Sequence, residues 1–158
     1  MKKQGFTLIE LMVVIVIMGI LAAVAVPKLF GMIAKSKASE VAPAAGTFVK
    51  LQEAYASENN AVGGWAAIGY KGPGNQHNAS STETGTFLYD DASANGSWKA
   101  YAKVALNDCN NGTWTVVTSY SSGNVTTAVK SSSKALCVTP LMPNFCKLAT
   151  TGDCGNDG

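Results

Sequence analysis

An unbroken apolar run covers residues 11–26 of the 158-residue chain. The ten residues before this run include the charged and polar side chains of the N-terminal segment, and Pro27 follows the run. As a helix, residues 6–26 would span roughly 32 Å at about 1.5 Å per residue, close to the roughly 30 Å of bilayer hydrocarbon. The pattern therefore predicts one membrane-spanning helix that carries a single carboxylate, Glu10, near its start.

After Pro27 the apolar positions continue on a thinner stripe with three- and four-residue spacing. The stripe consists of Val41, Ala45, Phe48, Leu51 or Gln52, and Tyr55. Such spacing is typical of an amphipathic helix with one buried face. The sequence predicts one long helix from residue 6 to about residue 57, whose outer half carries a globular domain. Pro43 is expected to bend it.

Between residues 59 and 97 no regular spacing of apolar residues continues, because glycine, proline and serine interrupt it. We expect a surface loop region here. Four apolar side chains are the expected anchors of this region on the core: Trp65, Ile68, Phe87 and Leu88.

From Trp98 onward the apolar period becomes two, which predicts strands with one buried face. Alternation extends over residues 98–106 and 114–118, with the turn dipeptide Asn111-Gly112 between them. Gly123-Asn124 turns the chain into residues 125–130, and a short strand is expected near residues 135–139. The predicted fold class is α+β, with the long helix packed on a three- or four-stranded antiparallel sheet.

Glu10 is the unusual residue of the apolar segment. A carboxylate at the centre of a membrane helix costs about 2.5 to 3.5 kcal/mol on insertion scales and usually marks a function. A free amine created at Phe6 would lie one helical turn away, at the i and i+4 positions. The charge therefore needs a cationic partner, from its own chain or from a neighbour.

The sequence Gly5-Phe6-Thr7-Leu8-Ile9-Glu10, with the basic leader, Gly19 and Pro27, resembles type IV pilins and the similar pseudopilins of type II secretion. The resemblance implies cleavage between Gly5 and Phe6 by prepilin peptidase, methylation of the new Phe6 amine, and pairing of Glu10 with the amine of an adjoining subunit. It implies a pilin-like fold and a homo-oligomeric helical fibre built by pilus assembly machinery. Our interpretation is that this chain is the major structural subunit of a type IV pilus. No surface or host ligand is implied.

The corresponding domain organisation is a leader at residues 1–5, a transmembrane and assembly helix at 6–27, and a globular domain at 28–158. Assembled pili of this family show a melted helical segment, and we expect it between Gly19 and Pro27, since Pro27 lacks a donor and glycine gains most from disorder. The precursor is expected to cross the inner membrane once, and the assembled fibre is expected outside the cell.

Two other functions remain open. A pseudopilin has the same architecture but pushes proteins through a secretion channel. A secreted carbohydrate-binding module would instead be released by signal peptidase after the A-x-A pattern that ends at Ala25. Glu10 and the length of the apolar run argue against an ordinary signal peptide.

The four cysteines all lie in the C-terminal part of the chain: Cys109, Cys137, Cys146 and Cys154. Lys2 and Lys3 favour a cytoplasmic leader, which places the cysteines in an oxidising compartment. Four cysteines allow three pairings, and the sequence favours Cys109 with Cys137 and Cys146 with Cys154. The expected meander argues against the first pair, because its first and fourth strands are not neighbours. The second pair resembles a small version of the C-terminal disulfide loop of pilins.

Charge and composition give little support to other activities. The 12 lysines, less Lys2 and Lys3, equal the 10 acidic side chains, and arginine is absent. Dedicated nucleic-acid recognition therefore has little support, although a fibre would repeat a weak lysine patch many times and DNA binding stays open as a minor alternative. No catalytic set accompanies His77, and Asp153, Asn156 and Asp157 lack the spacing of a calcium loop. The sequence predicts no enzyme, no metal site and no cofactor.

Overall fold

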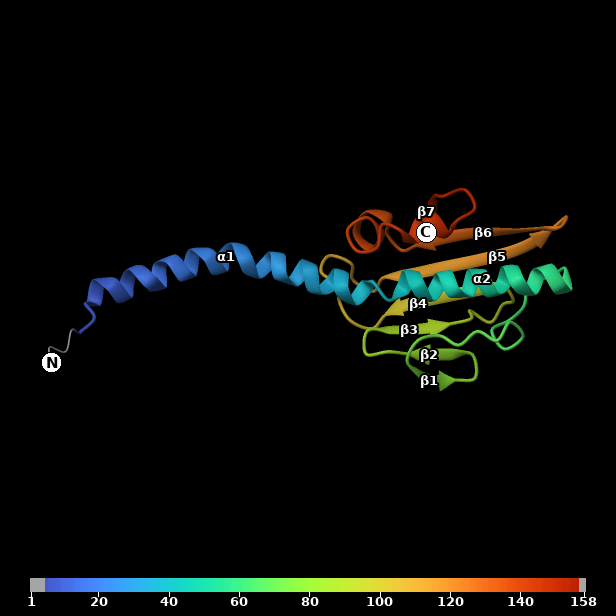
Figure 1. The fold of residues 1–158 in the computed structure, drawn as a ribbon, viewed down its shortest axis with the longest axis horizontal. Coiled ribbons are helices and arrows are strands. Elements are labelled where there is room, and N and C mark those ends of the chain that lie inside the picture. Colours follow the sequence, from blue (N-terminus) through green and yellow to red (C-terminus); the bar gives the residue numbers. More distant parts are fainter. Residues whose placement is uncertain (1–4, 157–158) are drawn as a thin grey trace. The chain divides into compact units, whose positions relative to one another are not determined.

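The computed structural model describes residues 5–156 of the chain. These residues form two compact units, of which the first ends at Ile33 and the second begins at Ala34. Two long helices come first and strands follow (Figure 1). Their bounds are α1 Leu8–Ala38, α2 Val41–Asn59, β1 Asn75–Asn78, β2 Ser81–Glu83, β3 Phe87–Asp90, β4 Ser97–Ala102, β5 Thr113–Ser121, β6 Asn124–Ser131 and β7 Cys154–Asn156. A π-helical turn, Lys134–Val138, and a 3₁₀ turn, Phe145–Leu148, lie between β6 and β7.

The helical region is divided at Ser39 and Glu40, so the prediction of one continuous helix is wrong. Pro43 provides the physical reason. A proline ring crowds the carbonyl of the residue four positions earlier, which is Ser39, and proline has no N–H to donate to it. The expected bend therefore lies one turn before the proline itself.

Helix α2 buries the predicted stripe. Its buried residues are Val41, Ala44, Ala45, Phe48, Val49, Gln52 and Ala56, and Leu51 and Tyr55 pack against the same core. The helix ends at Asn60, whose left-handed backbone (φ 53°) lets its N–H donate to the carbonyl of Ala56. The amphipathic outer half of the predicted helix is confirmed.

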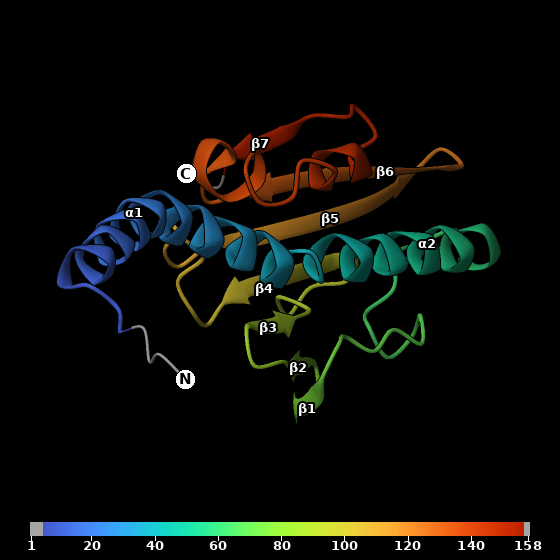
Figure 2. The same cartoon turned by 60° about the vertical axis from the view of Figure 1, so that its left-hand side comes forward.

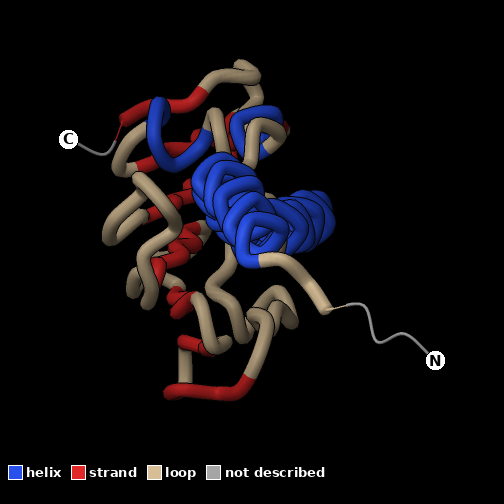
Figure 3. Tube along the Cα trace, turned by 90° about the vertical axis from the view of Figure 1, so that its left-hand side faces the viewer, coloured by secondary structure: helices blue, strands red, loops and turns tan. Residues whose placement is uncertain are grey.

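The sheet has seven strands rather than three or four, and their spatial order is their sequence order. Strands β1 to β6 form an antiparallel meander, and β7 joins the edge parallel to β6. Figures 1 and 2 show α2 along one face of this sheet, and Figure 3 shows the strands gathered in one layer beside the helix. The chain has the α+β arrangement expected of a pilin, with a larger sheet.

Three of the additional strands, β1 to β3, lie in the region expected to be a loop. Each has only three or four residues, too few to reveal a period between glycines and prolines. Strand β4 ends at Ala102 rather than near residue 106, and the strand expected near residues 135–139 is the π-helical turn. Among the expected anchors Trp65, Ile68 and Phe87 are buried, while Leu88 is half-buried.

Alternation in β4 and β5 places large side chains against α2. Trp98, Ala100, Trp114 and Val116 are fully buried, as the period of two predicts. Strands β5 and β6 are joined by Ser122 and Gly123, which both have positive φ. This is the two-residue turn whose twist suits a hairpin.

Two polar side chains of the helical region also fix it to the rest of the second unit. The buried Gln52 amide donates to the carbonyl of Gly63 at 2.6 Å and accepts from its N–H at 3.0 Å. The half-buried Glu40 carboxylate accepts from the Thr84 hydroxyl at 2.7 Å and from the Tyr89 hydroxyl at 2.8 Å. Burial, and then the hydrogen bond with Glu40, raise the pKa of Tyr89 above its usual value.

Candidate assembly site

The apolar side chains of α1 point outward. Large hydrophobic residues from Phe6 to Ile33 are exposed, with values such as 85% for Phe6 and 64% for Ile20. The best 18-residue window of this helix has a mean hydropathy of 2.9, and none of it is buried. Core helices and signal sequences meet the same criteria of length and composition, but a core helix would be buried. The segment therefore presents an apolar surface that needs lipid or other protein to cover it.

Thr7 and Glu10 form a capping box at the start of α1. One Glu10 oxygen, Oε2, accepts from the Thr7 N–H at 2.8 Å and from the Thr7 hydroxyl at 2.7 Å. In return, the Glu10 N–H donates to the Thr7 hydroxyl at 3.4 Å. This reciprocal arrangement satisfies donors that a helix N-terminus leaves open. The second carboxylate oxygen, Oε1, makes no hydrogen bond within the described part of the chain.

The capping box is a feature that our sequence analysis missed. Threonine three residues before glutamate, directly ahead of an apolar run, is the usual signature of such a cap. The structure shows that the charge of Glu10 is already compensated in part within a single chain.

The other predicted residues of this segment lie along the same stretch of chain. Gly5 and Phe6 precede the helix and lie outside any regular element. Gly19 and Pro27 both lie inside α1, which continues through them. A side chain at Gly19 would meet no atom within 4 Å. Lys2 and Lys3 of the leader lie outside the described residues.

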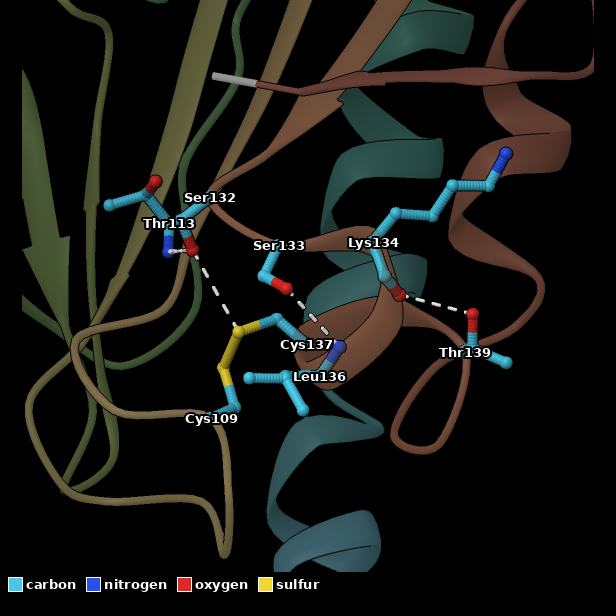
Figure 4. Close-up of a disulfide and its surroundings, with 8 residues drawn as sticks. All are labelled: Cys109, Thr113, Ser132, Ser133, Lys134, Leu136, Cys137 and Thr139. Carbon is cyan, nitrogen blue, oxygen red and sulfur yellow. Dashed lines mark hydrogen bonds between the residues drawn. A yellow bond between two sulfur atoms is a disulfide. The ribbon is translucent and has the colours of Figure 1, made fainter. Parts of the chain in front are cut away.

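The structure contains both disulfides that the sequence favours. Cys109 is bonded to Cys137, and Cys146 is bonded to Cys154. Figure 4 shows the first bond between the loop before β5 and the π-helical turn after β6. The Ser132 hydroxyl lies 3.8 Å from the Cys137 sulfur, and the Ser133 hydroxyl caps the turn by accepting from the Leu136 N–H.

The meander brings Cys109 and Cys137 together because its connections alternate between the two ends of the sheet. The loop from β4 to β5 and the segment that leaves β6 therefore lie at the same end. The Ser132 N–H donates to the Thr113 carbonyl at 3.0 Å, which joins these two segments directly. The objection from strand order does not hold, since neither cysteine is in a strand.

The residues considered for a metal site, His77 and the acidic C-terminal end, have other partners or lie outside the described structure. His77 is exposed and lies 3.6 Å from Glu83, and the described residues contain no group of three side chains suited to a metal ion. Asp153 pairs with Lys134, whose hydrogen bond and charge lower the pKa of Asp153. The side chain of Asn156 and all of Asp157 lie outside the described structure.

The three tryptophans do not form a sugar-stacking face. Trp98 and Trp114 are fully buried, and Trp65 is 6% exposed. A carbohydrate-binding module that stacks sugars on exposed aromatic rings would need the opposite arrangement. The packing role that the alternation indicated for Trp98 and Trp114 is confirmed.

Comparison with known proteins agrees with this description of the N-terminal segment. Residues 1–26 match the family described as the prokaryotic N-terminal methylation motif. The chain is 42% identical over 59 residues to the type IV major pilin protein PilA of Myxococcus xanthus, which covers 37% of this chain and 27% of that protein. It is 56% identical over 39 residues to a type IV major fimbrial protein FimA of Dichelobacter nodosus, which covers 25% of each chain.

A second Dichelobacter nodosus relative, named fimbrial protein, is 52% identical over 52 residues, or 32% of each chain. The similarity thus spans between about a quarter and a third of the length of these relatives. Together with the exposed apolar helix, these matches fit a membrane-anchored precursor and a surface pilus. The methylation motif and the similarity to type IV major pilins support the identification of this chain as a type IV pilin.

Proposed function

We propose that this chain is the major structural subunit of a type IV pilus, without catalytic activity of its own. The observation that carries the proposal is the Glu10 carboxylate, four residues after Phe6 in an exposed apolar helix, with one oxygen free. The capping box uses only one of the two carboxylate oxygens, and a carboxylate in an apolar surrounding stays costly until a cation pairs with it. The amine of a neighbouring subunit is the cation that polymerisation would bring.

In this proposal the precursor crosses the inner membrane once, with residues 6–27 in the bilayer and residues 28–158 on the periplasmic side. Prepilin peptidase removes residues 1–5, and the new amine of Phe6 is methylated. The pilus machinery then moves the helix from lipid into a bundle of identical helices. Lipid and helix surfaces are similarly apolar, so close packing and polar contacts must drive the association.

Pairing of Glu10 with a neighbour's Phe6 amine sets the axial register in this scheme. The capping box holds Oε2 on Thr7 and leaves Oε1 for the incoming amine. A subunit added one step out of register would leave both charges unpaired in an apolar surrounding, which costs several kcal/mol.

Processing gives the first test. Intact-protein mass spectrometry of the native product is expected to show a chain that begins at Phe6 and carries one additional methyl group. A mature N-terminus at Val26 would instead establish release by signal peptidase, and an unprocessed chain would also contradict the proposal.

A pair of glycine variants provides the control. Gly5→Leu is expected to leave unprocessed precursor in the membrane, because the peptidase of the resembled family needs a small residue before the cleaved bond. Gly31→Leu adds the same side chain where α1 has open space, and should be processed normally.

We further propose that the helix between Gly19 and Pro27 melts inside the fibre, although α1 is continuous there in the single chain. Pro27 cannot donate to the carbonyl of Ala23, and glycine lowers helix stability by about 1 kcal/mol relative to alanine. The double variant Gly19→Ala, Pro27→Ala is expected to give stiffer, less extensible fibres under tension, whereas Gly31→Ala should not. A fibre reconstruction with continuous helix from residue 6 through residue 30 in the unaltered protein would contradict this proposal.

A further inference from the structure

Three exposed lysines follow the apolar run closely: Lys28, Lys35 and Lys37. In the proposed orientation they lie on the periplasmic side, where they outnumber the two lysines of the leader. Lysines beside a membrane span normally favour the cytoplasmic side. No acidic residue lies between Glu10 and Glu40, and none of the three lysines makes an ion pair among the described residues. The proposed pairing of Glu10 gives these positive charges no role.

Lys28 lies at the depth where the bilayer would end. Counted from Leu8, a hydrocarbon layer of roughly 30 Å takes about 20 residues of helix at about 1.5 Å each, which reaches Pro27. Most side chains that follow are still apolar and exposed: Leu29, Phe30, Met32 and Ile33. In the proposed orientation, residues 28–33 therefore cross the layer of lipid headgroups.

One face of α1 has a shallow hollow at this depth. The hollow has a volume of about 280 Å³ and is lined by Ala25, Val26, Lys28, Leu29 and Met32. Four of these residues recur at spacings of three and four, which places them on one side of a helix. All five belong to the first compact unit. The Lys28 ammonium is the one charged group of an otherwise apolar lining.

A lysine beside an apolar hollow matches the chemistry of a phospholipid at its headgroup end. An acyl chain in the hollow would gain van der Waals contact along the helix. The flexible stem of Lys28 lets its ammonium reach the headgroups, where a phosphodiester can pair with it. In a zwitterionic lipid, the ammonium of the headgroup competes for the same phosphate. The site therefore favours a lipid with a net negative headgroup.

We propose that this face of α1 binds an anionic phospholipid of the periplasmic leaflet, with an acyl chain in the hollow and the phosphodiester on Lys28. Lys35 and Lys37, later in the chain, would add to the positive potential that attracts such lipids. The inference rests on the proposed function, since it requires residues 6–27 to span the inner membrane. Neighbouring helices would cover this face in the fibre, so the lipid would be a partner of the unassembled subunit.

The test is native mass spectrometry of the full chain in detergent micelles, with phosphatidylglycerol and phosphatidylcholine added in separate titrations. Both lipids have the same acyl chains, so that only the headgroups differ. The Kd of phosphatidylglycerol is expected to be at least about fivefold lower, the order expected for one lysine at a lipid surface. Added salt should reduce this preference, because it screens exposed charges.

A pair of lysine variants locates the charge that matters. Lys28→Gln should lower the preference for phosphatidylglycerol about fivefold, whereas Lys50→Gln, at an exposed position of α2, should leave it unchanged. The leader lysines can also attract anionic lipid, and Lys28→Gln keeps them. A preference that survives Lys28→Gln would therefore arise elsewhere in the chain and would overturn the proposal.

A pair of alanine variants tests the hollow. Ala25→Leu fills it and should weaken the binding of both lipids about threefold, without changing the preference between them. Ala23→Leu adds the same side chain two residues earlier, about 200° around the helix and outside the lining, and should weaken neither. Equal effects of the two variants would contradict an acyl chain in the hollow.

Membrane extraction separates failure of this inference from failure of the proposed function. A chain that alkaline carbonate removes from membranes would contradict the membrane span and the lipid site together. A chain that stays in the membrane but binds the two lipids equally would overturn the lipid site alone.

Discussion

The Glu10→Ala variant is expected to insert into the membrane normally and to yield almost no fibres. Insertion should improve slightly, because the variant lacks a charge that is costly in a bilayer. Assembly should fail, because the amine of each neighbouring Phe6 would enter the fibre core without a partner. Breaking a buried ion pair costs about 3 to 5 kcal/mol, which corresponds to at least a hundredfold loss of subunit incorporation. Membrane fractionation and counts of surface fibres by electron microscopy would measure both effects.

The capping box complicates this test, because alanine also removes the acceptor for the two Thr7 donors. Glu10→Gln separates the two roles, since glutamine can complete a capping box without a charge. We expect Glu10→Gln to lack fibres as well, and Thr7→Val, which keeps the charge but loses the threonine hydroxyl, to retain more of them. Normal fibres from Glu10→Gln would show that capping, rather than charge pairing, is the role of Glu10.

The second large effect is expected from the disulfide between Cys109 and Cys137. Removal of this bond by the double variant Cys109→Ala, Cys137→Ala should lower the free energy of unfolding by about 3.5 kcal/mol. The bond closes a loop with a sequence separation of 28 residues, so its absence gives the unfolded chain considerably more conformational entropy. Urea unfolding of the full chain in detergent micelles, followed by tryptophan fluorescence, would measure the change.

The second disulfide is the natural comparison. Cys146 and Cys154 are only 8 residues apart, and the same relation gives about 2.5 kcal/mol for their removal. Both pairs are buried, so exposure does not confound the comparison. A larger loss for the shorter loop would mean that local packing, rather than the entropy of the unfolded chain, determines what each bond contributes.

The sequence alone was sufficient for the features that depend on a long, regular pattern. The apolar run and the stripe around Phe48 each extend over several helical turns, and the alternation around Trp98 and Trp114 extends over most of two strands. Each of these elements buries or exposes one consistent face, so the spacing of its apolar residues can be read from the sequence.

Short elements and interruptions could not be predicted in this way. Strand β2 has three residues, and its position is set by pairing with β3, which a pattern of three residues cannot reveal. Strand β7 has three residues as well and depends on tertiary pairing with β6. The sequence predicted a bend from Pro43, but not that the helix would be divided at Ser39, one turn earlier.

In the assembly segment, the sequence was enough to select Glu10 and Phe6, since a lone carboxylate in an apolar run is costly wherever it lies. The hydrogen bonds of Thr7 required the structure, because the same spacing also occurs where no cap forms.

The strand order of the sheet has a consequence for how the second unit folds. Each strand from β1 to β6 pairs with the next strand along the chain, so the sheet can grow one hairpin at a time without closing long loops. Such local pairing lowers the contact order and favours fast folding. Docking of α2 is different, because Phe48 and its neighbours come first in sequence and bury themselves against strands made later. The apolar stripe of α2 therefore becomes buried only after β4 and β5 have formed. We expect docking of this helix to be the slow, non-local step of folding.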